Sequence, residues 1–238
     1  IDGSLPAFSP HEVVKGGARL LELQGACPFR AAVELRLGGV ELEHPAAGIA
    51  ATERGKLAHA VLQAFWDKVR EQSVLLAMTA DQRVAIVRTH VRSVLAPFRA
   101  TADAVGTRLL ALEERWLEAR VLELLQQDAE RAPFTVEFVE EPRVIDVGGV
   151  QTRIVLDRVD RLADGTFAVI DYKTGKPYHS NIEQVEVYAI GGFAKFDDVD
   201  TIHAELWYLD YAPKPQEKVI HRAQVSNLAR KWEIRAAR

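Results

Sequence analysis

The chain has 238 residues, of which 48% are hydrophobic and 27% charged, as in a globular protein and unlike a disordered or fibrous one. Its single cysteine excludes an intramolecular disulfide and any four-cysteine zinc or iron–sulfur site, and the net charge of −4 excludes a uniformly basic nucleic-acid-binding protein. No apolar run approaches the roughly 18 residues of a membrane span, and the N-terminus lacks a signal-peptide pattern. We therefore expect a cytoplasmic protein with no membrane partner.

The first half of the chain has the pattern of helices. Short helical stretches are expected at residues 13–23 and 28–37, with glycines marking the breaks. Apolar residues at helical spacing predict further, amphipathic helices; these cover residues 51–70, 81–98 and 109–125. Cys27, between the first two stretches, is expected to be a small buried hydrophobic residue.

From Pro133 the pattern changes to short runs rich in Val, Ile and Phe. The runs predict strands at residues 135–139, 143–147, 153–162, 166–172 and 204–211, with helices at 181–190 and 226–235. A strand core with helices before and after it is an α/β or α+β domain. We expect residues 1–238 to form one compact unit, mainly helical over residues 1–130 and a sheet core over 131–238.

The most informative stretch is RIVLDRVDRLADGTFAVIDYKTGK, residues 153–176. Its centre, Ala-Asp-Gly at 163–165, suits a three-residue hairpin loop with Gly165 in the left-handed conformation. Such a loop makes Leu162 and Thr166 partners and fixes the pairing of every residue along both strands.

This pairing brings two acidic side chains together. Asp157 lies directly opposite Asp171, and Lys173 shares the face of Asp171 because side chains two apart on a strand point the same way. Partners across strands have Cβ atoms about 4.5–5.5 Å apart, and like charges so placed destabilise a sheet. A two-residue loop would instead place Arg158 opposite Asp171.

The rest of the hairpin is apolar. On the first strand Ile154 and Leu156 are expected on one face and Val155 and Val159 on the other. On the second strand apolar residues alternate in the same way, so we expect a sheet that is covered on both sides.

Two neighbouring carboxylates in a sheet that is covered on both sides repel one another unless something compensates their charge. They can share a proton, or they can pair with Lys173 or Arg153. They can also bind a divalent cation, which prefers carboxylate oxygens and converts the repulsion into coordination.

Two pairs of residues at helical spacing are further candidates. Gly55 and His59 share a helical face, where His59 is either a packed or surface residue or, if that face meets the hairpin, a metal ligand. Gly55 would allow close approach of backbone or ligand. Gln184 and Tyr188 also share a face: either Tyr188 is core and Gln184 surface, or both hydrogen-bond a phosphate or base.

Three glutamates lie on or beside the strand before the hairpin. They are Glu137, Glu140 and Glu141. One of them could reach a metal, although a solvated strand edge also explains them.

The C-terminal segment is basic. Residues 214–238 contain seven Lys or Arg and two Glu, a local charge of +5 that leaves the rest of the chain at −9. Such a segment can contact phosphates, and a solvated helix face explains it at least as well.

Taken together, these motifs resemble those of RecB-type nucleases of the PD-(D/E)xK superfamily. The segment CPFRAAVELRL at Cys27 is similar to the start of this domain in AddB-like and Cas4-like proteins. The resemblance covers roughly residues 24–188 and implies a restriction-endonuclease-like fold, a mixed central sheet flanked by helices. The motifs, in chain order, are GxxxH (Gly55, His59), LDRVD (Asp157), IDYKTG (Asp171, Lys173) and QxxxY (Gln184, Tyr188).

The resemblance also implies roles for these residues. Asp157, Asp171, His59 and the main-chain carbonyl of Tyr172 would bind Mg²⁺ or Mn²⁺. Lys173 would orient or activate the attacking water and stabilise charge on the phosphate. Gln184 and Tyr188 would support the site.

One departure from the family matters. Many relatives carry four cysteines that hold an iron–sulfur cluster, whereas the segment after Tyr188 contains none. Cys27 therefore has no partners, and we expect no such cluster.

The implied activity is metal-dependent cleavage of DNA, single-stranded or at ends, by an exonuclease in repair or recombination. Because an acidic domain is poorly suited to gripping a long polymer, we expect the chain to be excised from a longer protein in which a helicase-like portion or subunit binds the DNA. Two other hypotheses remain: a non-catalytic scaffold or DNA-end-binding module, and a metal-dependent hydrolase of small phosphoesters.

Overall fold

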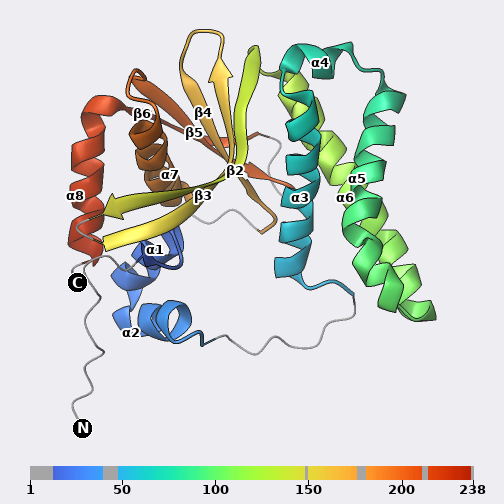
Figure 1. Ribbon diagram of the computed structural model, residues 1–238, viewed down its shortest axis with the longest axis horizontal. Coiled ribbons are helices and arrows are strands. Elements are labelled where there is room, and N and C mark those ends of the chain that lie inside the picture. Colours follow the sequence, from blue (N-terminus) through green and yellow to red (C-terminus); the bar gives the residue numbers. More distant parts are fainter. Residues whose placement is uncertain (1–12, 40–47, 148–149, 176–180, 211–213, 237–238) are drawn as a thin grey trace.

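The computed structural model describes residues 13–39, 48–147, 150–175, 181–210 and 214–236 (Figure 1). Its helices are α1 (Ala18–Ala26), α2 (Pro28–Ala31), the π-helical turn η1 (Ala32–Arg36), α3 (Ala51–Val69), α4 (Gln72–Ala77), α5 (Ala80–Thr101), α6 (Ala104–Glu130), α7 (Asn181–Lys195), the 3₁₀ turn η2 (Arg222–Gln224) and α8 (Val225–Ala236). Its strands are β1 (Val13–Val14), β2 (Phe134–Val147), β3 (Val150–Leu162), β4 (Phe167–Lys173), β5 (Thr201–Tyr208) and β6 (Gln216–His221).

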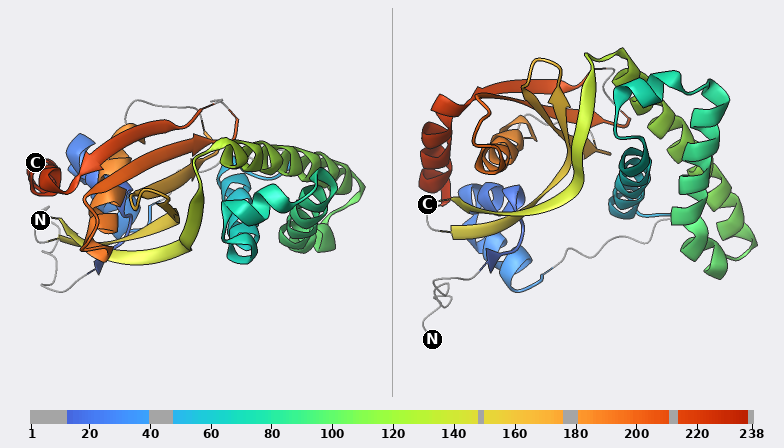
Figure 2. Two further views of the ribbon diagram at one scale, coloured as in Figure 1. Left: turned by 90° about the horizontal axis from the view of Figure 1, so that it is seen from above. Right: turned by 45° about the horizontal axis from the view of Figure 1, so that its top comes forward.

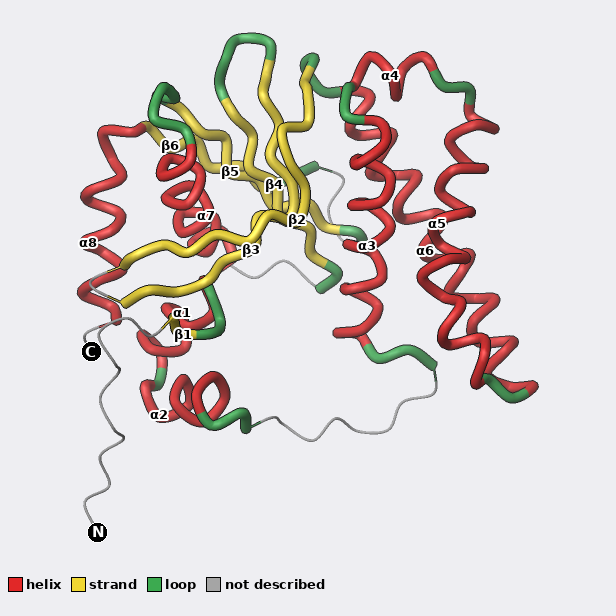
Figure 3. The backbone as a smooth tube through the Cα atoms, in the orientation of Figure 1, coloured by secondary structure: helices red, strands yellow, loops and turns green. Residues whose placement is uncertain are grey.

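The strands form one six-stranded mixed sheet in the order β1-β3-β4-β5-β6, with β2 paired to β3. Strand β3 is antiparallel to β2 and β4, and β5 is antiparallel to β6. Strands β4 and β5 are parallel, which requires the crossover that α7 supplies. In Figure 3, β2 and β3 run together as a long curved pair beside the shorter strands.

Helices cover both faces of this sheet (Figure 2). Helices α3 to α6 pack on one face, where their apolar side chains meet Ala168, Ile170 and Trp207. Helices α1, α7 and α8 lie against the other face, around Phe167 and Val169. The alternation along β4 thus follows the two-residue period of a strand, and the predicted mixed sheet flanked by helices is confirmed.

The first strand of the hairpin is covered less completely than the sequence predicts. Val155 is 39% exposed, whereas Val159 is buried in the same cluster as Ile154 and Leu156. The predicted division of β3 into two apolar faces is therefore wrong at these residues. The alternation of buried residues breaks between Leu156 and Val159, where Asp157 and Arg158 belong to charged clusters.

Other elements differ from the sequence prediction in extent. Strand β2 is continuous where two short strands are expected, and its ladder accommodates a register shift between Val136 and Phe138. Helices α5 and α6 extend beyond the predicted residues at both ends, and Thr79 and Asp103 cap their first turns with side-chain oxygens. The short α4 and β6 are absent from the prediction.

The single cysteine also differs from expectation. Cys27 is exposed at the junction of α1 and α2, not buried. Its φ of −161° is extended, so the chain leaves the helical conformation at this residue. Within the parts of the chain described, no helix has the length and apolar character needed to span a membrane.

Candidate metal centre

The β3–β4 hairpin has the predicted three-residue loop. The N–H of Leu162 donates to the carbonyl of Thr166 at 2.9 Å, and Gly165 has a φ of +84°, which glycine adopts without strain. Arg158 pairs with Ile170, so the alternative register that places Arg158 opposite Asp171 is wrong. The next position along this register sets Asp157 against Asp171, one residue beyond the last pair of the ladder.

Both aspartates are buried, and their partners differ. Asp157 Oδ2 accepts the backbone N–H of Tyr172 at 2.8 Å, which ties its carboxylate to the neighbouring strand. Asp171 Oδ2 lies 2.8 Å from Lys173 Nζ, so the predicted pairing with Lys173 is present for this carboxylate. Burial, followed by repulsion from Asp171, raises the pKa of Asp157 to about 7 despite attraction to His59.

Helix α3 brings His59 to the carboxylate of Asp157. Its Nε2 lies 2.9 Å from the carbonyl oxygen of Tyr172, and since a carbonyl can only accept, Nε2 carries the proton. Its Nδ1 then faces Asp157 Oδ2 at 3.6 Å. Burial opposes the charged imidazole, but Asp157 and Glu140 outweigh it and raise the pKa of His59 to about 9.

Gly55 explains why α3 can approach so closely. A Cβ atom at Gly55 would lie 3.1 Å from Oγ1 of Thr174, the residue that follows Lys173. The predicted role of Gly55 in close approach is thus visible as contact between α3 and the chain that leaves β4. The GxxxH spacing places Gly55 and His59 one turn apart on the face that meets this chain.

Helix α7 brings Gln184 to the site. The Nζ of Lys173 donates to Gln184 Oε1 at 3.1 Å, so this glutamine is not a simple surface residue. Tyr188, one turn later, is half-buried and packs against the hydrophobic cluster beneath the sheet. The predicted pair thus divides, with Gln184 at the charged cluster and Tyr188 against the core.

Glu140 joins the cluster, which sequence reasoning left undecided among three glutamates. Its Oε1 lies 3.4 Å from Nδ1 of His59. One ligand atom from each of His59, Glu140 and Asp157 lies within 4.8 Å of the others. The two neighbouring glutamates, by contrast, form ion pairs with arginines: Glu137 with Arg161 and Glu141 with Arg143.

A second charged cluster begins at the next residue of β3. The guanidinium of Arg158 is completely buried and bonds to both carboxylate oxygens of Asp128 on α6 at 2.7 and 2.8 Å. It also bonds to Asp160 at 2.6 and 2.7 Å and to the hydroxyl of Tyr172 at 2.9 Å. Arg131 contributes a second guanidinium, 2.7 Å from Asp160. Two arginines thus hold two aspartates here, and Glu205 on β5 lies 3.5 Å from the guanidinium of Arg131.

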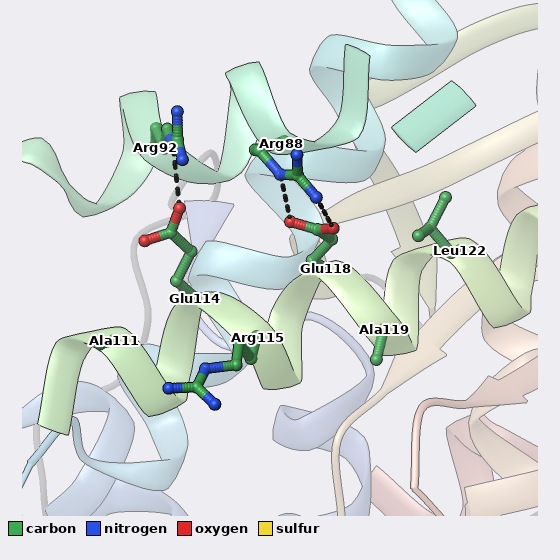
Figure 4. A pocket seen from close by; sticks show the side chains of 8 residues that line it. All are labelled: Arg88, Arg92, Ala111, Glu114, Arg115, Glu118, Ala119 and Leu122. Carbon is green, nitrogen blue, oxygen red and sulfur yellow. Dashed lines mark hydrogen bonds and ion pairs between the residues drawn. The ribbon is translucent and has the colours of Figure 1, made fainter. Parts of the chain in front are cut away.

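The arginine-lined hollow between α5 and α6 is a weaker candidate site (Figure 4). It encloses about 430 Å³, and its charges largely satisfy one another. Arg88 forms two hydrogen bonds with Glu118, and Arg92 forms one with Glu114. These pairs join two helices and leave less charge for a ligand than the aspartates of the hairpin.

The basic C-terminal segment is also partly committed to internal contacts. Glu186 on α7 is buried and binds Lys218 of β6 and Lys231 of α8. Arg222 donates to the backbone carbonyls of Phe196 and Val199. These basic side chains fasten α8 and β6 to α7, which favours the structural interpretation of this segment.

Comparison with known proteins agrees with this geometry. A solved structure titled "Crystal structure of SSO0001" is similar over 90% of this chain and 84% of that chain, at 17% identity and a TM-score of 0.27, too low to carry an argument. No curated protein matches the chain. A family model described as the PD-(D/E)XK nuclease superfamily matches residues 19–237. Because that match spans the helix of His59 and the hairpin of Asp157, Asp171 and Lys173, the chain belongs to the PD-(D/E)XK nuclease superfamily.

Proposed function

We propose that this chain is a deoxyribonuclease that hydrolyses phosphodiester bonds with Mg²⁺ or Mn²⁺. The observation that carries the proposal is the buried pair Asp157 and Asp171, beside His59 and Lys173, in a member of a nuclease superfamily. Carboxylate oxygens are the ligands that these cations prefer, and burial makes a compensating positive charge valuable.

The residues that would hold the ion are Asp157, Asp171 and His59. The raised pKa of Asp157 supports this fit, because burial and repulsion leave its carboxylate short of positive charge. The Tyr172 carbonyl, a direct ligand according to the resemblance, accepts the Nε2 proton of His59 here and so holds Nδ1 toward Asp157. A bound divalent cation lowers the pKa of water and neutralises charge that develops on the phosphate.

Lys173 is the residue we assign to the attacking water and the phosphate. Its ammonium is held between Asp171 Oδ2 at 2.8 Å and Gln184 Oε1 at 3.1 Å. A fixed ammonium can donate to the water and stabilise charge on a phosphate oxygen without reorganising during the reaction. We assign Gln184 to positioning Lys173, and Tyr188 to fixing α7 against the sheet.

The finer assignment follows the RecB-type resemblance: an exonuclease acting on single strands or ends, in repair or recombination. The charge of the chain supports the additional proposal that a helicase-like portion or subunit binds the DNA. The net charge is −4, and Lys218 and Lys231 are bonded to Glu186. Metal-bridged contact with one phosphate does not need a basic surface, whereas sustained grip on a polymer does.

A cleavage assay with matched substrates tests this function. The chain is incubated with Mn²⁺ or Mg²⁺ and with end-labelled linear DNA or circular single-stranded DNA. We expect metal-dependent loss of the linear substrate, with circles spared because an exonuclease needs an end. Asp171→Ala and Lys173→Ala should abolish this activity while circular dichroism shows an intact fold, and Lys68→Ala, at an exposed lysine of α3, should cleave like wild type.

Two results would contradict the proposal. Wild-type-like cleavage by either Asp171→Ala or Lys173→Ala would remove the site from the chemistry. DNA binding without Mn²⁺ binding or cleavage would identify the chain as a non-catalytic module instead. Digestion of circles as fast as linear molecules would retain the nuclease and overturn the exonuclease assignment.

A further inference from the structure

Glu140 occupies an unusual backbone conformation in β2. Its φ is +49°, in the left-handed region that residues other than glycine seldom adopt. Its flanking residues pair regularly, Val139 with Arg158 and Glu141 with Leu156, so Glu140 sits in the register position opposite Asp157. A conformation of this kind is unfavourable for a residue with a side chain and persists where surrounding structure imposes it.

The consequence of this conformation is the direction of the carboxylate. Glu141, the next residue, bonds to Arg143 at 2.5 Å on its own strand. Glu140 instead reaches the helix across from it, where its Oε1 lies 3.4 Å from His59 Nδ1. Of the three glutamates in β2, Glu140 is the one that lies beside a candidate metal ligand, whereas the other two form ion pairs with arginines.

The spacing of the cluster suits one small ion. Single ligand atoms of His59, Glu140 and Asp157 lie within 4.8 Å of one another. Oxygen and nitrogen ligands lie about 2.0–2.2 Å from Mg²⁺ or a small transition-metal ion, so ligands of a shared ion are separated by at most about twice that distance. Glu140 therefore needs little movement to join His59 and Asp157 around a cation placed between them.

We propose that Glu140 supplies a carboxylate oxygen to the divalent cation held by His59 and Asp157. Without the cation, the same carboxylate lies beside the imidazole and limits its movement. This inference rests on the metal site of the proposed function and adds a ligand that the sequence motifs do not include. The left-handed backbone at Glu140 would then serve to direct its side chain away from the strand edge and into the cluster.

Calorimetric titration of Mn²⁺ into the whole chain tests this proposal, with thermal unfolding as a second readout. Glu140→Gln keeps the side-chain shape and removes the charge, and Glu141→Gln is the matched control one residue away. We expect Glu140→Gln to bind Mn²⁺ at least about tenfold more weakly than wild type and to gain less thermal stability from it. Glu141→Gln should match wild type in both measurements.

A second variant distinguishes loss of metal binding from loss of folding stability. Glu140→Gly removes the carboxylate and suits the positive φ, so the metal-free protein should be at least as stable as wild type while Mn²⁺ still binds more weakly. If Mn²⁺ binds wild type, Glu140→Gln and Glu140→Gly equally, Glu140 is not a ligand and the metal site stands without it. If wild type itself binds no Mn²⁺, the proposed function fails as well.

Discussion

Asp157 and Arg158 are consecutive residues of β3 that belong to two charged clusters of different kinds. In the cluster of Arg158, two guanidinium groups contact two aspartates directly at 2.6–3.1 Å, and Glu205 lies 3.5 Å from one of them. In the cluster of Asp157, carboxylates face one another, an imidazole and a single lysine. In the first cluster each aspartate is paired with arginine, as in a structural contact. In the second cluster the negative charge of the carboxylates is balanced only in part by the protein.

The two clusters differ in whether a cation from solution can bind. A buried aspartate with a bidentate arginine already has its counter-charge, because the guanidinium supplies both charge and hydrogen bonds. Asp157 instead has a backbone N–H and an imidazole 3.6 Å away, and its raised pKa of about 7 reflects the positive charge that it lacks. A divalent ion would relieve this deficit, while at Asp128 and Asp160 it would have to displace arginine.

The largest contrast is expected from neutralising one aspartate of the metal cluster. Asp157→Asn should lower nuclease activity by at least about a thousandfold, since a ligand and its charge are lost. At pH 8 without metal, its Tm should equal or exceed that of wild type, because the variant removes repulsion and still accepts the N–H of Tyr172. Parallel cleavage and thermal unfolding measurements check both signs, and a marked fall in Tm would contradict this account of the cluster.

The matching change in the arginine cluster should act on stability. Asp128→Asn leaves Arg158 buried with one full carboxylate partner fewer, which should cost about 3–5 kcal/mol of unfolding free energy. Urea unfolding of the purified variant gives this value. A cost below about 1 kcal/mol would mean that the buried network contributes little to joining α6 and the sheet.

The stability of the metal-free protein should depend on pH. The folded-state pKa values of Asp157 (about 7) and His59 (about 9) lie above their unfolded values of about 3.9 and 6.5, so folding takes up protons at both. The site's contribution to stability is therefore lost as pH rises, from about 4 to 7 for Asp157 and from about 6.5 to 9 for His59.

Added Mn²⁺ should reverse this trend, because the ion binds the deprotonated groups. Its stabilising effect, measured as the rise in Tm, should grow between pH 6 and pH 9. Asp157→Asn should flatten the lower part of the metal-free profile. If Mn²⁺ raises the Tm by the same amount across this pH range, metal binding does not depend on the protonation of Asp157 or His59.

The smallest effect is expected at the contact between α3 and the chain after β4. Gly55→Ala places a Cβ 3.1 Å from Thr174 Oγ1, so the segment next to Lys173 must shift by a few tenths of an ångström and activity should fall several-fold. Gly55→Ala combined with Thr174→Ala removes the contact. The double variant should recover most of the activity and gain about 0.5–1 kcal/mol in stability, because alanine favours a helix more than glycine. Kinetics of the single and double variants measure the recovery of activity. If the double variant recovers no activity, this contact does not act on Lys173.

The hairpin and its acidic pair were predictable because their information is local. Asp164 and Gly165 specify the loop: Asp164 accepts from the N–H of Thr166, and Gly165 takes the left-handed conformation. Once the loop is known, the two-residue period of a strand places Asp157 opposite Asp171. The helical spacing of Gly55 and His59 is local in the same way, although only the fold could bring that helix to the hairpin.

The remaining features depend on contacts between distant segments. Arg158 and Asp128 lie 30 residues apart, and nothing near either residue indicates the pair. The position of Glu140 depends on a left-handed residue inside a strand, which no sequence period encodes. The sequence also predicts two short strands, at residues 135–139 and 143–147, where β2 is one continuous strand through EEPR at residues 140–143. Cys27 is exposed because the chain bends between α1 and α2, and its residue type alone favours burial.

Anomalous diffraction from crystals of the chain soaked in Mn²⁺ would locate the ion. We expect a Mn²⁺ peak about 2.0–2.4 Å from carboxylate oxygens of Asp157 and Asp171 and from a ring nitrogen of His59. We expect no peak at Asp128 or Asp160, where arginine already supplies the positive charge. A well-diffracting soaked crystal with no ion between the hairpin and α3, or with the ion at the arginine cluster instead, would contradict this expectation.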